Sequence, residues 1–182
     1  MIFQVLSLAG VLLGLLPAVS APVRDEQTAS AATIDWAARG CTADRAFGFR
    51  FGERPSEPGH RLLDDTRQPF PRLTLARTER SRRLFRVETV GMFRAAPGST
   101  QSDREAGRRL FEAVDARIVE LGGFANRSRT VDEDGDIDIT YSNPIDGPDS
   151  EVVLEVTLML GGVWISCEHQ GLRRQHLEEV LR

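Results

Sequence analysis

The chain contains no lysine, and all of its 23 basic residues are arginine. We interpret this as a bias of the coding sequence and assign it no function. The formal net charge is −4, whereas a domain that binds nucleic acid generally carries a basic surface. The composition therefore argues against a general nucleic-acid binder.

Motifs of the common enzyme classes are also missing. None of the three histidines, His60, His169 and His176, belongs to a His-Glu-x-x-His zinc motif. No Gly-x-Ser-x-Gly elbow and no glycine-rich phosphate loop occurs. We therefore predict no cofactor and favour a non-catalytic protein. Acidic residues are numerous, so a glycosidase-like carboxylate pair stays open, although nothing singles out two of them.

The apolar run at the N-terminus is too short for a comfortable membrane span, which needs roughly 20 residues. It covers residues 2–16, where Gln4 and Ser7 are the only polar side chains, and small residues follow at 18–21. This pattern predicts a signal peptide over 1–21, with an uncleaved anchor as the alternative. We expect a tether over 22–32 and a single domain over 33–182. The mature protein would then be periplasmic or secreted, with no membrane span.

Only two cysteines occur, Cys41 and Cys167. In an oxidising compartment an even pair most simply forms a disulfide. The alternatives are a reactive thiol pair or metal ligands, but there is no Cys-x-x-Cys motif and no second cluster of ligands. We predict a structural disulfide.

Hydrophobic periodicity predicts an α+β fold. We expect an antiparallel sheet of about six to seven strands, with one long central helix and a C-terminal helix packed against it. Ser102 and Glu105 match a capping box at the start of the long helix. The expected elements are a helix over 33–39, strands over 46–51, 73–77 and 84–94, a helix over 102–121, hairpins over 124–142 and 152–168, and a final helix; the proline-rich stretch 53–72 is irregular.

Two details of strand register follow from the pattern. The apolar residues of 84–94 move from Phe85 and Val87 to Val90 and Met92, which predicts a bulge near Gly91.

The hairpin over 152–168 is expected to turn at its adjacent glycines, 161 and 162. This turn places Cys167 on the core side and Trp164 on the opposite side beside Met159, where we expect the C-terminal helix to cover it. The predicted pairs are Leu160 with Val163, Leu158 with Ile165, and Val156 with Cys167.

Four aspartates, Asp132, Asp134, Asp136 and Asp138, resemble the start of an EF-hand calcium loop. The resemblance covers twelve residues and departs from the EF-hand at two demanding positions. The sixth is Ile137 instead of glycine, and the twelfth is Asn143 instead of glutamate. We interpret the segment as a charged hairpin tip and keep weak calcium binding as the alternative.

Basic residues cluster around one expected turn and would suit an anionic partner, such as a cell-envelope polymer, a lipid headgroup or an acidic protein surface. A solvated turn is the simpler interpretation. The residues are Arg77, Arg80, Arg82, Arg83 and Arg86.

Taken together, the sequence favours an exported, non-catalytic binding, inhibitor or assembly module with a protein or cell-envelope partner. The alternatives are a hydrolase of an envelope polymer that uses carboxylates, and a calcium-responsive module. A concave pocket with converging carboxylates or His60 would favour the enzyme. A flat surface with an exposed aromatic patch would favour the binding module.

Overall fold

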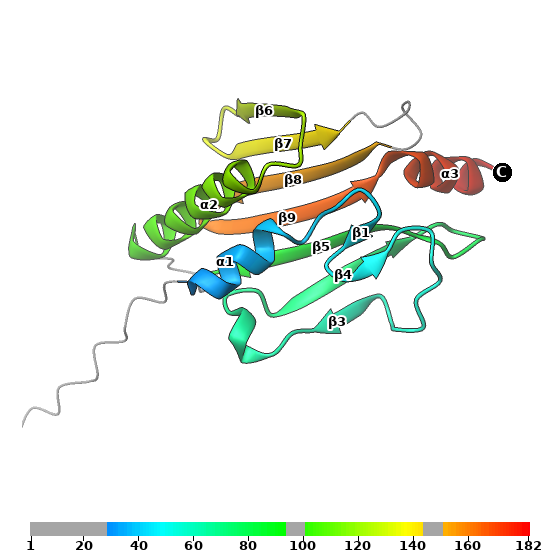
Figure 1. Ribbon diagram of the computed structural model, residues 1–182, viewed down its shortest axis with the longest axis horizontal. Helices are drawn as coiled ribbons and strands as arrows, with labels where there is room; N and C mark the ends of the chain where they lie inside the picture. The colour runs from blue at the N-terminus through cyan, green and yellow to red at the C-terminus, as the bar shows by residue number, and fades with distance from the viewer. Residues whose placement is uncertain (1–28, 94–100, 144–150) are drawn as a thin grey trace, which may run out of the picture.

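The computed structural model describes residues 29–93, 101–143 and 151–182. The expected signal peptide and its cleavage site lie outside these residues. The described chain forms a seven-stranded antiparallel sheet in the order β3-β4-β5-β9-β8-β7-β6, and a separate two-stranded hairpin, β1-β2 (Figure 1). The strands of the large sheet are β3 (His60–Leu62), β4 (Arg72–Arg77), β5 (Leu84–Met92), β6 (Asn126–Val131), β7 (Ile137–Asn143), β8 (Val152–Met159) and β9 (Gly162–His169).

The remaining elements gather on one face and at one end of this sheet. Helices α1 (Ala31–Ala38) and α2 (Gln101–Leu121) lie over the same face as the hairpin of β1 (Arg45–Ala46) and β2 (Phe49–Arg50) (Figure 1). Helix α3 (Gln170–Leu181) continues from the end of β9, and a short 3-10 turn, η1 (Asp65–Arg67), precedes β4. The predicted α+β class, the strand number and both main helices are confirmed.

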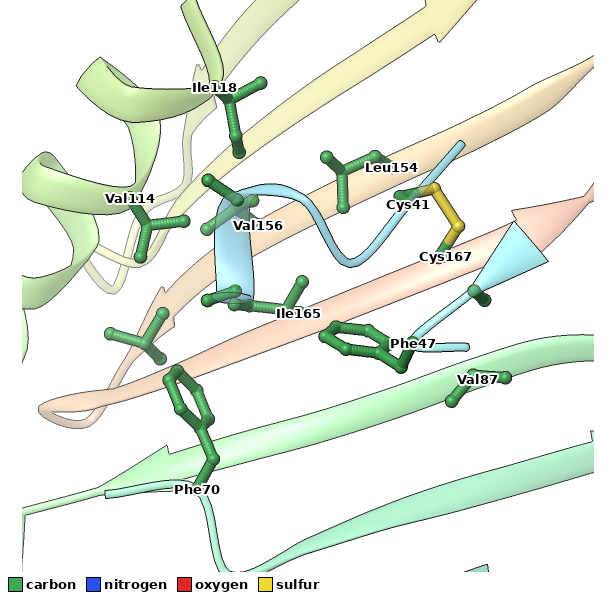
Figure 2. Packing of buried hydrophobic residues seen from close by; sticks show 14 of the residues in the cluster. Cys41, Phe47, Phe70, Val87, Val114, Ile118, Leu154, Val156, Ile165 and Cys167 are labelled. Carbon is green, nitrogen blue, oxygen red and sulfur yellow. A yellow bond between two sulfur atoms is a disulfide. The ribbon is translucent and has the colours of Figure 1, made fainter. Parts of the chain in front are cut away.

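The core lies between α2 and the centre of the sheet. Leu110, Val114 and Ile118 form the buried stripe of α2 and belong to one cluster with the inward side chains of β8 and β9 (Figure 2). Val156 and Ile165, which pair across these two strands, are fully buried. Alternation along both strands directs every second residue into this core, so the intervening residues face the other side.

A disulfide joins Cys41 to Cys167 at the edge of this core, with the two Cα atoms 5.7 Å apart (Figure 2). Cys41 follows α1 and Cys167 lies in β9, 126 residues later. The chain-entropy model assigns a loop of this length about 4–5 kcal/mol as an upper figure. The predicted disulfide is present, and it ties the N-terminal layer to the middle strand of the sheet.

The strand expected over 46–51 is wrong, because the chain reverses within it. Phe47 and Gly48 have positive φ angles of 50° and 89° and form the two-residue turn between β1 and β2. Two consecutive positive φ angles are typical of the tight turns that join antiparallel strands. The ring of Phe47 packs at 5.0 Å from that of Trp36 and fills the space where Gly40 lacks a side chain.

The bulge expected near Gly91 is also wrong, since the pairing of β5 with β9 continues through this residue. Thr89 is buried on the core side, and its hydroxyl donates to a backbone carbonyl of β4. Gly91 is on the same side, where an added Cβ would lie 2.7 Å from the ring of Phe70. Val90 and Met92 therefore belong to the opposite face, and the apolar residues of β5 simply occupy both sides.

The β8–β9 hairpin turns one residue earlier than the sequence suggested. Leu160 and Gly161 have φ angles of 50° and 82°, and Met159 pairs with Gly162. A one-residue shift of the turn moves every cross-strand partner by two residues, which leaves the facing directions unchanged. The observed pairs are Leu158 with Val163, Val156 with Ile165, and Leu154 with Cys167.

Both main helices differ in detail from expectation. Ser102 lies inside α2 instead of capping it, while Gly122, with a φ of 61°, follows the end of α2 as expected. The apolar residues of α3 are largely exposed, among them Leu177 and Val180. Among the described helices, none is long and apolar enough to cross a membrane.

Gly107 provides a test of how α2 sits on the sheet. A Cβ at this position would overlap the carbonyl oxygen of Gly161 in the β8–β9 turn. Glycine to alanine normally stabilises a helix interior by about 0.5–1 kcal/mol. We expect Gly107→Ala instead to lower the free energy of unfolding by about 1–3 kcal/mol because of this overlap, measured by urea denaturation.

Gly59→Ala is the matched control, because no heavy atom lies within 4 Å of a Cβ added there. Its stability should stay within about 0.5 kcal/mol of the wild type. A stabilised Gly107→Ala variant would contradict the close approach of α2 to the hairpin turn.

Candidate functional site on the open face of the sheet

The face of the sheet opposite α1 and α2 carries ordered rows of polar side chains. The strand registers place these residues in three rows that run across β5, β9, β8 and β7, so that members of a row are direct neighbours on adjacent strands. The rows are Arg86, Glu168, Val153 and Ser142; Glu88, Ser166, Glu155 and Thr140; and Val90, Trp164, Thr157 and Asp138.

A hollow of about 630 Å³ lies over these rows. Its walls come from the rows themselves, from the β6–β7 turn and from the start of α3. The lining residues outside the rows are Asp132, Asp136, Met159, Gln170 and Arg173. The site is therefore built mainly on the central strands of the sheet, which the core holds from behind.

Glu168 is the most thoroughly paired carboxylate of the hollow. Its Oε1 accepts hydrogen bonds from Gln170 Nε2 and Arg173 Nη1, both at 3.0 Å. Arg86 Nη1 lies 3.6 Å from its other oxygen. Since Gln170 and Arg173 belong to the first turn of α3, these contacts fix that helix to β9.

Glu88 is an acid with a perturbed pKa. Burial raises the pKa of Glu88, and the neighbouring Glu168 and Glu155 carboxylates add to the effect, while Arg86 opposes it. Arg86 Nε lies 2.9 Å from Glu88 Oε1, and the Glu88 side chain is only 14 % exposed. Burial thus outweighs a direct ion pair, which shows how strongly this position disfavours a charged carboxylate.

Glu155 shows the same shift without any cation in contact. Desolvation within the hollow raises the pKa of Glu155, and Asp138 and Glu168 raise it further. Glu155 is an exposed residue, and no hydrogen bond or ion pair reaches its carboxylate from any described residue. Asp138 accepts a hydrogen bond from Thr157 Oγ1 at 2.6 Å. Asp138 and Glu155 thus lie on neighbouring strands without an ion pair to any described residue, although Arg173 and Arg86 act on Glu155 from a distance and partly lower its pKa.

Trp164 is the aromatic residue of the open face. It lies between Val90 and Thr157 in its row and keeps 36 % of its surface exposed. The C-terminal helix, expected to cover Trp164, instead makes its described contacts at the end of the sheet, where His176 stacks on Phe85. The ring therefore lines the hollow.

The acidic tip forms a self-contained turn. Asp132 Oδ1 accepts the backbone N–H groups of Asp134 and Asp136 at 3.0 and 2.9 Å. Asp138 lies beyond the turn, in β7, where it faces the hollow. Residues 29–93, 101–143 and 151–182 contain no group of three histidine, cysteine or acidic side chains arranged to hold a metal ion. Calcium binding stays a prediction.

The five arginines of the expected basic patch are divided among three places. Arg77 donates to the carbonyl oxygens of Glu57 and Pro58, and Arg86 faces the hollow. Only the exposed Arg80, Arg82 and Arg83 remain together, on the β4–β5 turn. Binding of an anionic partner by this turn stays a prediction.

The β4–β5 turn is also the docking point of α3. Glu179 accepts hydrogen bonds from the backbone N–H groups of Arg80 and Ser81 at 2.6 and 3.1 Å. Desolvation opposes ionisation of Glu179, but these bonds and those from the side chains of Ser81 and Gln175 prevail and lower its pKa to about 2. Polar contacts therefore hold the last turns of α3 against the β4–β5 turn.

Comparison with models of protein families, with curated proteins and with solved structures gives no match to this chain. The site is therefore defined by its geometry. Sequence reasoning did not single out Glu88, Glu155 or Glu168 from the other acidic residues. The signal available in the sequence was the alternation of Glu155 and Thr157 with buried residues in β8. These side chains become part of a site only when β5 and β7 are placed on either side of the β8–β9 hairpin.

The raised pKa of Glu155 predicts a pH-dependent effect on stability. Its folded pKa lies above the ordinary value of 4.5, so the folded state binds a proton more tightly than the unfolded state. Stability then falls as pH rises from about 4.5 through the folded pKa, and the full loss persists at neutral pH. We expect Glu155→Gln to raise Tm at pH 7 and to leave it nearly unchanged below pH 4, measured by calorimetry.

Glu112→Gln removes an equal charge from the exposed surface of α2 and serves as the control. The difference in Tm between Glu112→Gln and the wild type should not grow between pH 4 and pH 7. A Glu155→Gln difference that does not change with pH would contradict the assignment of this carboxylate to an unfavourable environment.

Proposed function

We propose that this chain is an exported, non-catalytic binding module that holds its ligand on the open face of the sheet, around Trp164. The observation that carries the proposal is a hollow of about 630 Å³ over the central strands, lined by polar side chains and a partly exposed tryptophan. Ligand sites commonly measure about 300–1,000 Å³ and combine apolar surface with a few placed polar groups.

Two features support export. The cysteines at 41 and 167 form a disulfide inside the fold, and such bonds persist mainly in oxidising compartments. The N-terminal residues have the apolar and small-residue pattern of a signal peptide. The two together support a periplasmic or secreted location.

The construction of the site supports binding. Its side chains stand on β5, β9, β8 and β7, whose opposite sides carry buried residues such as Val87, Val156 and Ile165. A site on packed strands keeps its geometry better than one on loops. Trp164 offers a rigid aromatic surface, the residue type most often found at the energetic centre of an interface. The ligand would be a protein or a component of the cell envelope.

Two variants test this placement by capture of envelope components on the immobilised protein. Trp164→Ala removes the aromatic surface, and Ser166→Arg fills the middle of the hollow, so we expect each to reduce the captured ligand by about tenfold or more. Leu160→Ala is the control, because Leu160 is 87 % exposed at the hairpin turn and outside the hollow.

The alternative surface is tested in the same assay. Replacing Arg80, Arg82 and Arg83 with glutamate should leave capture by the open face intact. Loss of capture in that triple variant, with full capture by Trp164→Ala and Ser166→Arg, would assign binding to the β4–β5 turn and refute the proposal.

A second candidate function is hydrolysis of an envelope polysaccharide. The converging carboxylates of the concave hollow favour it by the criterion given above, whereas the partly exposed Trp164 favours the binding module. Glu88 and Glu155 lie in one row on either side of Ser166, which places their Cα atoms about 10 Å apart at the usual strand spacing. Inverting glycosidases hold their two carboxyl groups about 6.5–9.5 Å apart. The more buried Glu88, whose pKa is raised, would protonate the leaving oxygen, and Glu155 would take a proton from the attacking water.

This candidate has its own measurement, the release of reducing ends from purified peptidoglycan. The wild type should show turnover, and Glu88→Gln and Glu155→Gln should each lower it by about 10² or more. The Glu112→Gln variant should keep full activity. Absence of turnover by the wild type would remove the hydrolase and leave the binding module.

A further inference from the structure

The hollow carries a marked excess of negative charge. Six carboxylates and two guanidinium groups line it. Carboxylates at such short range repel one another, and a low-dielectric wall strengthens that repulsion. The acidic residues are Glu88, Asp132, Asp136, Asp138, Glu155 and Glu168, and the basic residues are Arg86 and Arg173.

Both guanidinium groups are already engaged by carboxylates of the hollow. Arg86 contacts Glu88 and Glu168, and Arg173 contacts Glu168. Glu155 and Asp138 receive no ion pair from any described residue, and Asp138 accepts only a hydroxyl hydrogen bond. Two carboxylates without a direct ion pair thus lie on the β7–β8 side of the hollow.

An aromatic surface lies beside this charge. Trp164 is separated from Asp138 by Thr157 alone in its row, and Met159 adds apolar surface to the wall. The face of a tryptophan ring attracts a cation that lies within about 6 Å of the ring centre. The long stems of arginine and lysine pack on apolar surface while their charged ends reach polar groups. The arrangement matches such a side chain in both charge and shape.

We infer that the occupant of the hollow is an arginine- or lysine-containing segment of a partner protein, with a basic side chain placed between Trp164 and the carboxylates of Asp138 and Glu155. This inference rests on the proposed binding function and names its ligand. Four strands at the usual spacing span about 14 Å, which accommodates about four residues of extended chain. A segment of that length fits the hollow better than a single small amine.

Among the described residues, the exposed β4–β5 turn with Arg80, Arg82 and Arg83 is a basic segment of this kind. This turn and the β8–β9 turn lie at opposite ends of the central strands, because β5 and β9 are antiparallel. Insertion of the turn of one copy into the hollow of the next would join two different surfaces, a head-to-tail contact that repeats into a ring or an open filament. We therefore assign the hollow to a different protein and treat self-association as an outcome of the test.

The test uses defined peptides and the folded, oxidised protein. A peptide with four arginines spaced by glycine and serine is titrated by calorimetry, together with the same peptide carrying neutral citrulline, and with spermine. We expect the arginine peptide to bind at least about tenfold more tightly than the citrulline peptide, and its affinity to fall with added salt. Spermine should bind more weakly than the arginine peptide.

Variants place the binding in the hollow. The double variant Asp138→Asn with Glu155→Gln should lower the affinity for the arginine peptide by about tenfold or more. The double variant Glu112→Gln with Glu178→Gln loses the same charge on exposed residues outside the hollow and should change this affinity little. Calorimetric melting of both double variants establishes that they are folded. Unchanged peptide affinity in Asp138→Asn with Glu155→Gln would overturn the inference.

The remaining outcomes separate this inference from the proposed function. Equal affinity for the arginine and citrulline peptides, with capture of envelope material still lost in Trp164→Ala, would refute the cationic ligand and keep the open-face site. If the variants of the hollow lose neither peptide affinity nor capture of envelope material, both the cationic ligand and the open-face site are refuted. Tighter binding of spermine than of the arginine peptide would overturn the partner segment in favour of a polyamine. Concentration-dependent sedimentation that is abolished by glutamate at 80, 82 and 83 would overturn it in favour of a second copy.

Discussion

The pairing of β5 with β9 is the interaction on which the rest of the structure depends. These strands come from separate parts of the chain, yet they form an unbroken antiparallel ladder from Arg86 with Glu168 to Met92 with Gly162. This ladder joins the β3–β4–β5 part of the sheet to the β6–β9 part. It also brings Glu88 beside Ser166, so that without it neither the continuous core nor the rows of the open face would exist.

Local sequence patterns predicted the elements much better than their partners. The α2 stripe, the glycines after it and the alternation of β8 each depend on neighbours within one element, so the sequence reveals them directly. Register was harder: moving the β8–β9 turn from the two glycines to Leu160 and Gly161 changed every partner by two positions. Facing directions survived this error because the side-chain period of a strand is two.

The candidate site was harder still, because it depends on strand order. Glu88 and Glu155 are 67 positions apart in the chain. They meet across Ser166 through the β8–β9 hairpin and the long-range pairing of β5 with β9. The clusters that the sequence did emphasise are local ones, at the acidic tip and the arginine-rich turn. In the structure the tip satisfies its own backbone through Asp132, and the turn is held by Glu179. Part of each cluster also lines the hollow, through Asp132, Asp136 and Arg86. What the sequence did not reveal is the strand order that brings these residues to Glu88 and Glu155.

Cys167 lies between Ser166 and Glu168, and all three are buried in β9. Its side chain is cross-linked to Cys41 on the core side, while both of its neighbours line the hollow. The covalent anchor therefore acts at the backbone that presents these two side chains to an incoming molecule. A strand fastened from behind loses little further freedom when something docks in front of it, and a smaller entropic cost of docking allows a modest set of contacts to suffice.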